Sequence, residues 1–434
     1  MQLISKILLV SNKTSNKSLL LTLLFALFIV PAQIQATTLA IACGAVGTEY
    51  EICKKSAEGW AKRTGNVVKM ISTPNDTDRK LGIFQQLLSS QSSDIDVLTV
   101  DVIWPGILGN HFLELKDVVP ADEIKDHFPS LVENNTVGGR LVAIPQYVDA
   151  GMIYYRKDLL AKYKLKEPKT WEELTVAAKT IQDGEKKSNP KFSGFVFQGK
   201  AYEGLTCNAL EWISSFGGGT IIDGKGNVTI NNPKAIEALK LAASWIGTIA
   251  PEGVLTYAEE EARGVFQSGN AAFMRNWPYA WALVNSPDST IKGKVGIIAI
   301  PGSKNQAKGS PTLGGWHVAV SKYTKHPKEA VELARFLAGK PEQKDRVKFG
   351  FNPTIQSLYK DKEVLSNSEI LGKFGNSLSN SVARPSRVSG ADYNKVSNDF
   401  WNMVSRVISK KDTPEAAIAD LETKLQKLKK RSGW

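Results

Sequence analysis

The clearest indication of the fold class is the stretch Ile95-Asp96-Val97-Leu98-Thr99-Val100-Asp101, which has the length and composition of a buried strand that ends in an acid. Two strand–helix pairs precede it, with strands expected over 39–42 and 67–71 and helices over 48–63 and from about 75 to 90. Strand, helix, strand, helix, strand predicts a parallel sheet with helices on its faces.

The same alternation continues through the second half of the chain. We expect strands over 152–155, 195–197, 271–274, 295–300 and 315–320, and helices over 170–182 and 233–249. Helices dominate after Pro327. No tandem repeat or low-complexity linker separates the two α/β units, which predicts two lobes joined by crossing segments and not by a tether.

The composition is that of an ordinary globular protein. The chain has 434 residues, 42% hydrophobic and 23% charged, which suits two domains and excludes a mostly disordered or collagen-like chain. Four histidines and three scattered cysteines argue against a zinc-rich module, and we expect neither a metal nor a cofactor. Cys43 and Cys53 could pair in an oxidising compartment, but their spacing leaves the question open. For Cys207 we favour a buried free thiol.

Residues 1–36 have the layout of a removable secretory signal. Three lysines and no acid lie near the start, residues 19–30 are apolar apart from one threonine, and a polar stretch ends in the small residue Ala36. This apolar run is too short for a bilayer core, which needs about 20 residues, so a retained membrane anchor is the weaker alternative. We therefore expect an exported, periplasmic protein, and loss of the signal lowers the formal charge of +12 by three.

Signatures of several common enzyme classes are missing from the sequence. It contains no Gly-x-Ser-x-Gly elbow, no Walker-type phosphate loop and no His-Glu-x-x-His zinc motif. The four histidines lie far apart and do not form a ligand set. Counting carboxylates does not test for a glycosidase, because that chemistry depends on the distance between two of them.

Aromatic residues stand beside polar ones at the ends of several expected elements. The segments are 145–151 before one strand, 275–281 after another and 312–317 at the start of a third. Ligands of α/β proteins bind where strands end and helices begin. An aromatic ring offers a flat apolar surface, and nearby carboxylates and arginines offer directional hydrogen bonds, which together suit a sugar ring. The alternative for each aromatic residue is packing in a core or between lobes.

Four blocks of sequence carry a family resemblance. They are Tyr147-Val-Asp-Ala-Gly-Met-Ile-Tyr-Tyr-Arg-Lys-Asp-Leu-Leu160, Phe266-Gln-Ser-Gly-Asn-Ala-Ala-Phe-Met-Arg-Asn-Trp-Pro-Tyr-Ala-Trp281, Thr312-Leu-Gly-Gly-Trp-His317 and Ala383-Arg384-Pro385. In this order they resemble the extracellular solute-binding proteins of ABC sugar importers of the maltose-binding type, and look closest to the trehalose/maltose-binding proteins. The similarity covers nearly all of the chain after the signal.

The resemblance implies an α/β fold of the periplasmic binding protein type, a two-lobe clamp in which each lobe is a sheet flanked by helices and hinge segments cross between them. The first lobe is expected over 37–148 and about 300–345, and the second over 149–299 and about 346–434. The ligand would lie in the cleft, and closure would bury it. By their match to the family pattern, the ligand-binding residues are Glu49, Arg79, Asp101, Tyr147, Asp149, Trp277, Tyr279, Gly315, Trp316 and Arg384.

Two of these assignments depend on register. Arg79 stands next to Lys80, so the match could shift by one position. The family places a glutamate at the start of the first helix, where both Glu49 and Glu51 are available. Thr48 is the expected N-cap, with Glu51 at the third position of a capping box. Residues two apart on a helix point about 200° apart, so we assign the ligand contact to Glu49.

The implied function is that of the periplasmic binding component of an ABC transporter. It would capture an α-glucoside disaccharide (trehalose, maltose or sucrose) and deliver it to the inner-membrane ABC permease, as a monomer and without breaking a bond. A nucleic-acid partner is not expected of an exported chain. The basic charge could favour an acidic face of the permease or anionic lipid, but a general basic bias of the surface explains it equally well. The alternatives are a secreted carbohydrate-active hydrolase with two cleft carboxylates, and the same fold with another small solute.

The signal generates a prediction about the exported chain. We expect its amino terminus at or near Thr37, because the apolar run and the small residue Ala36 are the features that signal processing requires. Intact-mass spectrometry of the exported protein measures this. An unprocessed amino terminus, or a lipid attached to Cys43, would contradict it.

Overall fold

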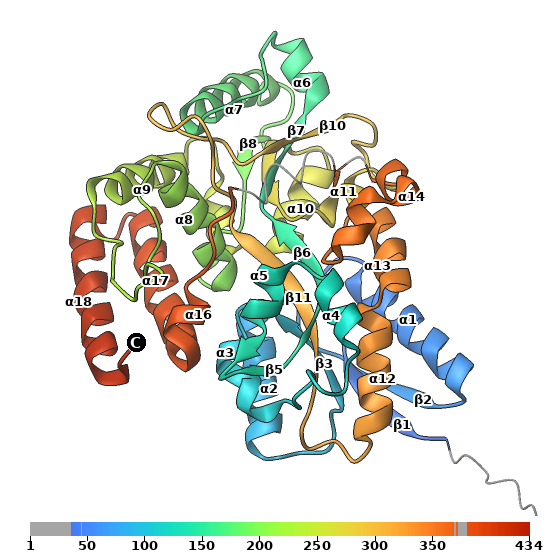
Figure 1. The fold of residues 1–434 in the computed structure, drawn as a ribbon. Helices are drawn as coiled ribbons and strands as arrows, with labels where there is room; N and C mark the ends of the chain where they lie inside the picture. The colour runs from blue at the N-terminus through green and yellow to red at the C-terminus, as the bar shows by residue number, and fades with distance from the viewer. Residues whose placement is uncertain (1–35, 45, 369, 372–379) are drawn as a thin grey trace, which may run out of the picture. The chain divides into compact units, whose positions relative to one another are not determined.

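The computed structural model describes residues 36–44, 46–368, 370–371 and 380–434 (Figure 1). The expected signal, apart from its last residue, lies outside these described residues. Residues from 37 to the end of the chain form one compact unit. None of the helices in the described part of the chain combines the length and the hydropathy that a membrane span requires.

The first sheet has six strands in the order β12-β6-β11-β3-β1-β2. Its strands β1 (Thr38–Ala42), β2 (Val67–Ile71) and β3 (Val97–Asp101) are parallel, as predicted. Strand β11 (Leu313–Val320) lies antiparallel between β3 and β6 (Ile144–Ala150). The sheet is therefore mixed, and the prediction of a parallel sheet applies only to the first three strands.

Helices cover both faces of this sheet, which we call the sheet of the first lobe. Helices α1 (Glu49–Thr64) and α12 (Pro327–Ala338) share a hydrophobic core with one face. Helix α2 (Thr77–Ser89) shares another core with the opposite face. Neighbouring residues of β3 point into different cores because successive side chains of a strand alternate between its faces.

Strand β6 runs almost directly into β7 (Met152–Arg156), which belongs to the second sheet. The sequence pattern identifies 145–151 only as a segment that precedes a strand, whereas the structure makes most of it a strand of its own, with all seven residues of β6 buried. Gly151 joins the two strands, and a Cβ at this position would lie 1.9 Å from Oε1 of Glu211. This turn is thus a crossing segment that only glycine fits.

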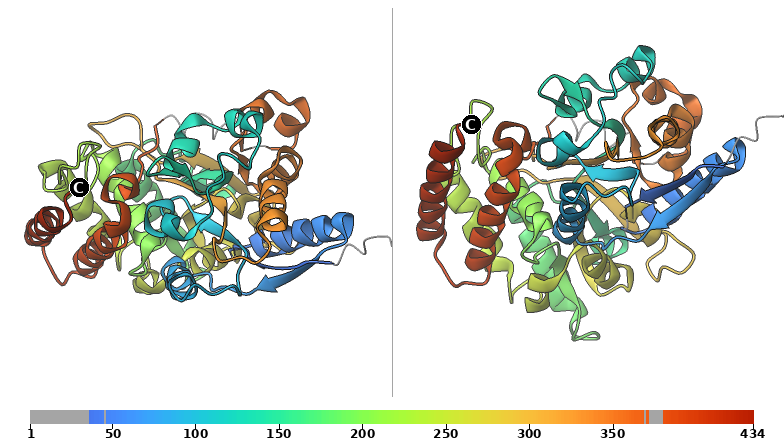
Figure 2. Two further views of the ribbon diagram at one scale, coloured as in Figure 1. Left: turned by 60° about the horizontal axis from the view of Figure 1, so that its bottom comes forward. Right: turned by 90° about the horizontal axis from the view of Figure 1, so that it is seen from below.

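The second sheet, that of the second lobe, has four strands in the order β10-β7-β9-β8. Strand β9 (Ala271–Asn276) pairs parallel with β8 (Ser193–Val196) and antiparallel with β7, and β10 (Val295–Ala299) is antiparallel to β7. Helices that contribute to one core with this sheet include α7 (Trp171–Glu185), α8 (Glu203–Ser215), α9 (Pro233–Trp245), α17 (Tyr393–Ile408) and α18 (Pro414–Ser432). The views in Figure 2 show α17 and α18, in red, beside α8 and α9, in green.

Shorter elements connect these layers. The helices are α3 (Pro105–Leu108), α4 (Ala121–Asp126), α5 (Pro129–Asn134), α6 (Lys157–Lys162), α10 (Glu259–Gln267), α11 (Ala280–Val284), α13 (Lys340–Arg346), α14 (Lys362–Ser366) and α16 (Ser386–Ser389). The 3-10 helices are η1 (Gly109–His111), η2 (Glu252–Thr256), η3 (Val347–Phe349), η4 (Gln356–Lys360) and η5 (Gly390–Asp392). The strands are β4 (Thr136–Val137), β5 (Arg140–Leu141) and β12 (Asn352–Pro353). Because β12 pairs with β6, the six-stranded sheet extends past residue 345, and the exact lobe boundaries stay a prediction.

The start of α1 differs from the expected capping box. The hydroxyl of Thr48 makes no cap hydrogen bond, so that prediction is wrong. A disulfide joins Cys43, which follows β1, to Cys53 in α1, and so restrains the connecting loop covalently. This answers the question that the cysteine spacing left open. Cys207 is a buried free thiol, as predicted.

Candidate ligand-binding site

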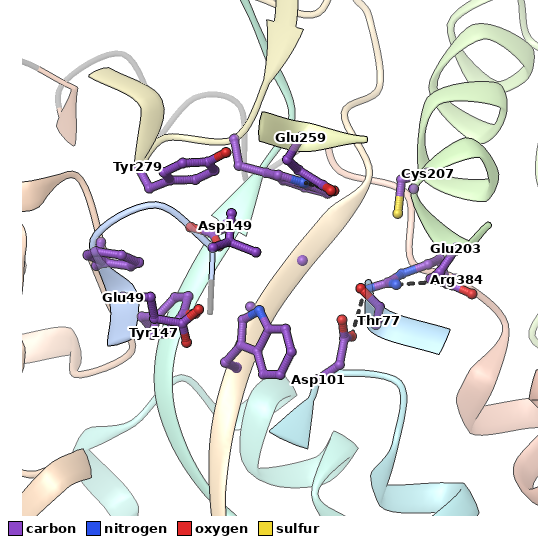
Figure 3. Close-up of a pocket in the computed structure, with 17 residues that line it drawn as sticks. Glu49, Thr77, Asp101, Tyr147, Asp149, Glu203, Cys207, Glu259, Tyr279 and Arg384 are labelled. Atoms are coloured by element: carbon purple, nitrogen blue, oxygen red, sulfur yellow. Dashed lines mark hydrogen bonds and ion pairs between the residues drawn. The ribbon is translucent and has the colours of Figure 1, made fainter. Parts of the chain in front are cut away.

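A cavity lies between the ends of strands from both sheets and the starts of several helices (Figure 3). The space inside it that a water-sized molecule could occupy is about 60 Å³, well below the usual range of small-molecule sites, so the walls are closely packed in this arrangement. Nine of the ten predicted residues line it, Arg79 being the exception. The lining residues are Val46, Glu49, Thr77, Asp101, Tyr147, Asp149, Glu203, Gly204, Cys207, Glu259, Trp277, Tyr279, Gly314, Gly315, Trp316, Phe351 and Arg384.

Arg79 points to solvent, and the neighbouring Lys80 takes the inward position on α2. The backbone N–H of Arg79 donates to Asp76, while the Lys80 ammonium donates to the Cys43 carbonyl at 3.0 Å and lies 4.3 Å from the centre of the Trp316 ring. Successive helical residues differ by about 100°, so only one of the two can face the sheet. Burial lowers the pKa of Lys80 to about 8, against the opposing attraction of nearby carboxylates. The structure thus gives Arg79 no contact with the cavity.

Glu49 lies inside the cavity wall, and Glu51 is exposed, so the structure places these two side chains as expected. The carboxyl group of Glu49 fills the space beside Gly44, where a Cβ would lie 1.7 Å from its Cδ. Burial raises the pKa of Glu49, while Lys80 and the Tyr147 hydroxyl oppose that rise. Its Oε1 atom is buried and has no hydrogen-bond partner among the described residues.

Strands β6 and β11 supply the wall beside the crossing segment. Tyr147 and Asp149 are two residues apart on β6, and β11 pairs Trp316 with Tyr147. Gly315 has a φ of +133°, and a Cβ there would lie 2.5 Å from the Tyr147 carbonyl oxygen, so only glycine allows this close approach. Burial and the charge of Glu49 raise the pKa of Asp149 well above its ordinary value. Its Oδ1 atom is also buried without a partner in the described part of the chain.

The opposite wall comes from the turn after β9. Trp277 is half-buried, its indole N–H donates to Glu259 at 3.3 Å, and the Tyr279 hydroxyl donates to Glu260 at 2.6 Å. The guanidinium carbon of Arg275 lies 4.0 Å from the centre of the Trp277 ring. These contacts hold the indole in place at the strand-to-helix junction.

Arg384 connects the two walls at the far end of the cavity. One of its Nη atoms contacts Asp101, at the end of β3, at 3.0 Å, and the other contacts Glu203, at the start of α8, at 2.9 Å (Figure 3). Glu203 also accepts hydrogen bonds at 2.6 Å from the hydroxyls of Tyr393 and Ser397. Arg384 is buried, so these ion pairs are not surface salt bridges.

Sequence reasoning missed several lining residues, above all Glu203 and Glu259. Both are the first residues of helices, and both have a pKa raised chiefly by burial. The sequence signal that could have identified them is an acidic residue at the start of a helix. That signal is weak, because such residues usually lie at the surface and interact favourably with the helix dipole. Gly314 belongs to the block 312–317 but was not among the predicted binding residues. A Cβ at Gly314 would lie 3.0 Å from the Trp277 ring.

The arrangement suits a polyhydroxylated ligand. Ring faces from both sheets flank the cavity, and buried carboxylate oxygens without partners among the described residues can accept hydrogen bonds from hydroxyl groups. No group of three or more potential metal ligands occurs within the described ranges.

Comparisons with known proteins find relatives over most of the chain. Residues 44–344 match the family model described as bacterial extracellular solute-binding protein. A Deinococcus radiodurans protein, named probable ABC transporter-binding protein, is 52% identical over 409 residues, which cover 94% of this chain and 97% of that protein.

Solved structures share the fold. The maltose-bound MalE3 of T. maritima has a TM-score of 0.85 and 36% identity, with 91% of this chain and 100% of that chain covered. A ribitol-bound solute-binding protein from Agrobacterium radiobacter has a TM-score of 0.79 and 24% identity, over 90% and 98% of the two chains, which shows the fold alone. These likenesses confirm the expected α/β fold with two lobes.

The support beneath Trp277 generates a prediction about stability. Arg275 and Glu211 form a fully buried ion pair, in which Nε donates to Oε2 at 2.8 Å. Glu211→Gln should lower the free energy of unfolding by about 3–5 kcal/mol, because it leaves a buried guanidinium without its counter-charge. Denaturant titration of the sugar-free protein measures this.

The matched control is Asp183→Asn, which breaks an exposed pair with Lys179 in α7 of the same lobe. That change should cost less than about 1 kcal/mol. An equal loss of unfolding free energy in the two variants would contradict the prediction, because it would show that the buried Arg275 pair contributes no more to stability than an exposed pair.

Proposed function

We propose that this chain, which belongs to the bacterial extracellular solute-binding proteins, captures an α-glucoside disaccharide and delivers it to the membrane permease of an ABC transporter. Trehalose, maltose and sucrose are the candidate ligands. We further propose that the protein acts as a monomer in the periplasm after export, and that it binds its ligand without chemical turnover.

One observation carries the proposal: the indole rings of Trp277, in the turn after β9, and of Trp316, in β11, line the same cavity as several carboxylates. A pyranose presents C–H groups on its faces and hydroxyl groups around its edge, so it matches aromatic faces together with hydrogen-bond acceptors. The buried oxygens of Glu49 and Asp149 that lack partners among the described residues are such acceptors.

The relatives support the ligand class and the partner. The T. maritima structure, at 36% identity, was solved with maltose. The Deinococcus relative covers almost the whole chain and carries an ABC transporter name, which favours a permease as the partner. The ribitol-bound structure shares only the fold, so a linear polyol belongs in the test as a competing ligand.

Burial of the polar lining implies a mechanism of opening and closing. Glu49, Asp101 and Asp149 are each less than a tenth exposed, so a disaccharide reaches them only if the lobes separate. A ligand that contacts both walls in the closed arrangement binds that arrangement more tightly than the open one. It therefore shifts the population toward closure, and no covalent step is needed.

The binding experiment uses refolded, sugar-free protein, because a closed cleft can retain sugar from the expression host. Calorimetry with trehalose, maltose, sucrose, glucose and ribitol should show tightest binding of one disaccharide, and small-angle scattering should give a smaller radius of gyration with that sugar. Identical scattering curves at saturating ligand would remove the clamp mechanism. Release of glucose over hours would favour the hydrolase instead. Tighter binding of ribitol than of any disaccharide would show that the ligand is a linear polyol and not an α-glucoside.

Replacement of Trp277 tests its role as a ligand platform. Trp277→Ala should weaken binding of the preferred sugar by about 2 kcal/mol, roughly 30-fold, because it removes one ring face, and should change sugar-free stability less. Trp245, packed among Trp171, Phe195 and Trp212, provides the control. Trp245→Ala should lower stability by about 3–5 kcal/mol, since it leaves a cavity in a core. A large stability loss with near-normal affinity would assign Trp277 to the core as well.

A further inference from the structure

The amino-terminal ends of α2 and α8 meet at the edge of the cavity. Helix α2 packs on the sheet of the first lobe, and α8 packs in the core of the second. Oδ2 of Asp78, in the first turn of α2, accepts a hydrogen bond at 3.0 Å from the backbone N–H of Glu203, the first residue of α8. Thr77, the first residue of α2, lies beside Glu203 and Arg384 in the cavity lining (Figure 3).

Two helix amino termini that face each other repel, because each carries a partial positive charge and several N–H groups without helical partners. Hydrogen-bond acceptors between them therefore stabilise this arrangement. Asp76 accepts a hydrogen bond from the backbone of Arg79 within its own helix and pairs with Lys200, which precedes α8. Asp78 supplies the second acceptor.

The two helices differ in which side chain accepts a hydrogen bond from the free N–H groups of the first turn. Helix α2 has its own N-cap, Asp76, whereas the N-cap of α8, Tyr202, makes no cap hydrogen bond through its side chain. Asp78 thus serves as the cap of α8, although it belongs to the opposite lobe. When the lobes separate, this hydrogen bond is lost and α8 has no cap from its own N-cap side chain.

The capped residue is itself central to the cavity. Glu203 accepts from Arg384, and Arg384 also holds Asp101, so one chain of contacts runs from Asp78 through Glu203 and Arg384 to the end of β3. The backbone position of Glu203 fixes where its carboxylate can reach. Asp78 therefore acts on the lining through Glu203 and without lining the cavity itself.

We propose that Asp78 is a positioning residue for ligand capture: by capping α8 across the cleft, it stabilises the closed arrangement and fixes Glu203 and Arg384 against the ligand. The inference rests on the proposed function and adds a contact between the lobes that no ligand provides. Partial burial supports it: Asp78 is half-buried, and burial together with the neighbouring Glu203 raises the pKa of its carboxyl group to about 7.

The test compares Asp78→Ala, Asp78→Asn and Thr170→Ala in full-length protein, with maltose as the probe. Asp78→Ala should bind maltose about five- to tenfold more weakly, with faster dissociation, while its sugar-free melting temperature stays close to wild type. Asp78→Asn keeps an acceptor oxygen and should recover most of the affinity. Thr170 caps α7 within the second lobe, so Thr170→Ala should lower the melting temperature and leave the affinity unchanged.

Several results would overturn the proposal. Wild-type affinity in Asp78→Ala would remove the role of Asp78, and an equal loss in Asp78→Asn would show that charge and not capping is responsible. Failure of the wild type to bind maltose or any other sugar in the panel would overturn the proposed function instead. If another sugar of the panel binds in place of maltose, the same three variants are compared with that sugar, and wild-type affinity in Asp78→Ala would again reject the proposal.

Discussion

The position of β11 between β3 and β6 is the constraint on which the cavity depends. Its register sets Trp316 opposite Asp101 on one side and opposite Tyr147 on the other, so three lining residues are placed by backbone hydrogen bonds. The approach of β11 to β6 requires Gly315, whose φ and lack of a Cβ allow contact with the Tyr147 carbonyl. A side chain at that position would push the strands apart and move Trp316 with them.

Buried arginines join the walls that the sheets provide. Arg275 and Arg384 both pair with glutamates of α8, namely Glu211 and Glu203. Withdrawing such charges from water costs several kcal/mol per ion, and pairing offsets that cost only when geometry is good and the other hydrogen bonds are satisfied. Stability alone is therefore a weak reason for these pairs. Their position behind Trp277 and beside Asp101 indicates that they orient the lining.

The fold is compatible with several solutes, as the maltose-bound and ribitol-bound structures of similar fold show. Ligand choice therefore depends on the side chains of the lining. In this chain the lining combines aromatic rings from both lobes with carboxylates whose charges are partly matched by Arg384 and, from behind the wall, by Lys80. The disulfide between Cys43 and Cys53 restrains the same wall, because Cys43 also accepts the hydrogen bond of Lys80.

Local pattern was sufficient for the alternation of strands and helices and for the turn that presents Trp277, and the resemblance of four sequence blocks to a known family supplied most of the residues that the cavity brings together. These features follow from hydrophobic periodicity and from blocks of neighbouring residues, which a linear chain displays directly. Long-range packing settled the rest: the antiparallel insertion of β11, the strand over 144–150, the inward Lys80 in place of Arg79, and the recruitment of Glu203 and Glu259. Each depends on which distant segments meet and in what register, and strand register and buried ion pairs are fixed only when the sheets and helices pack together.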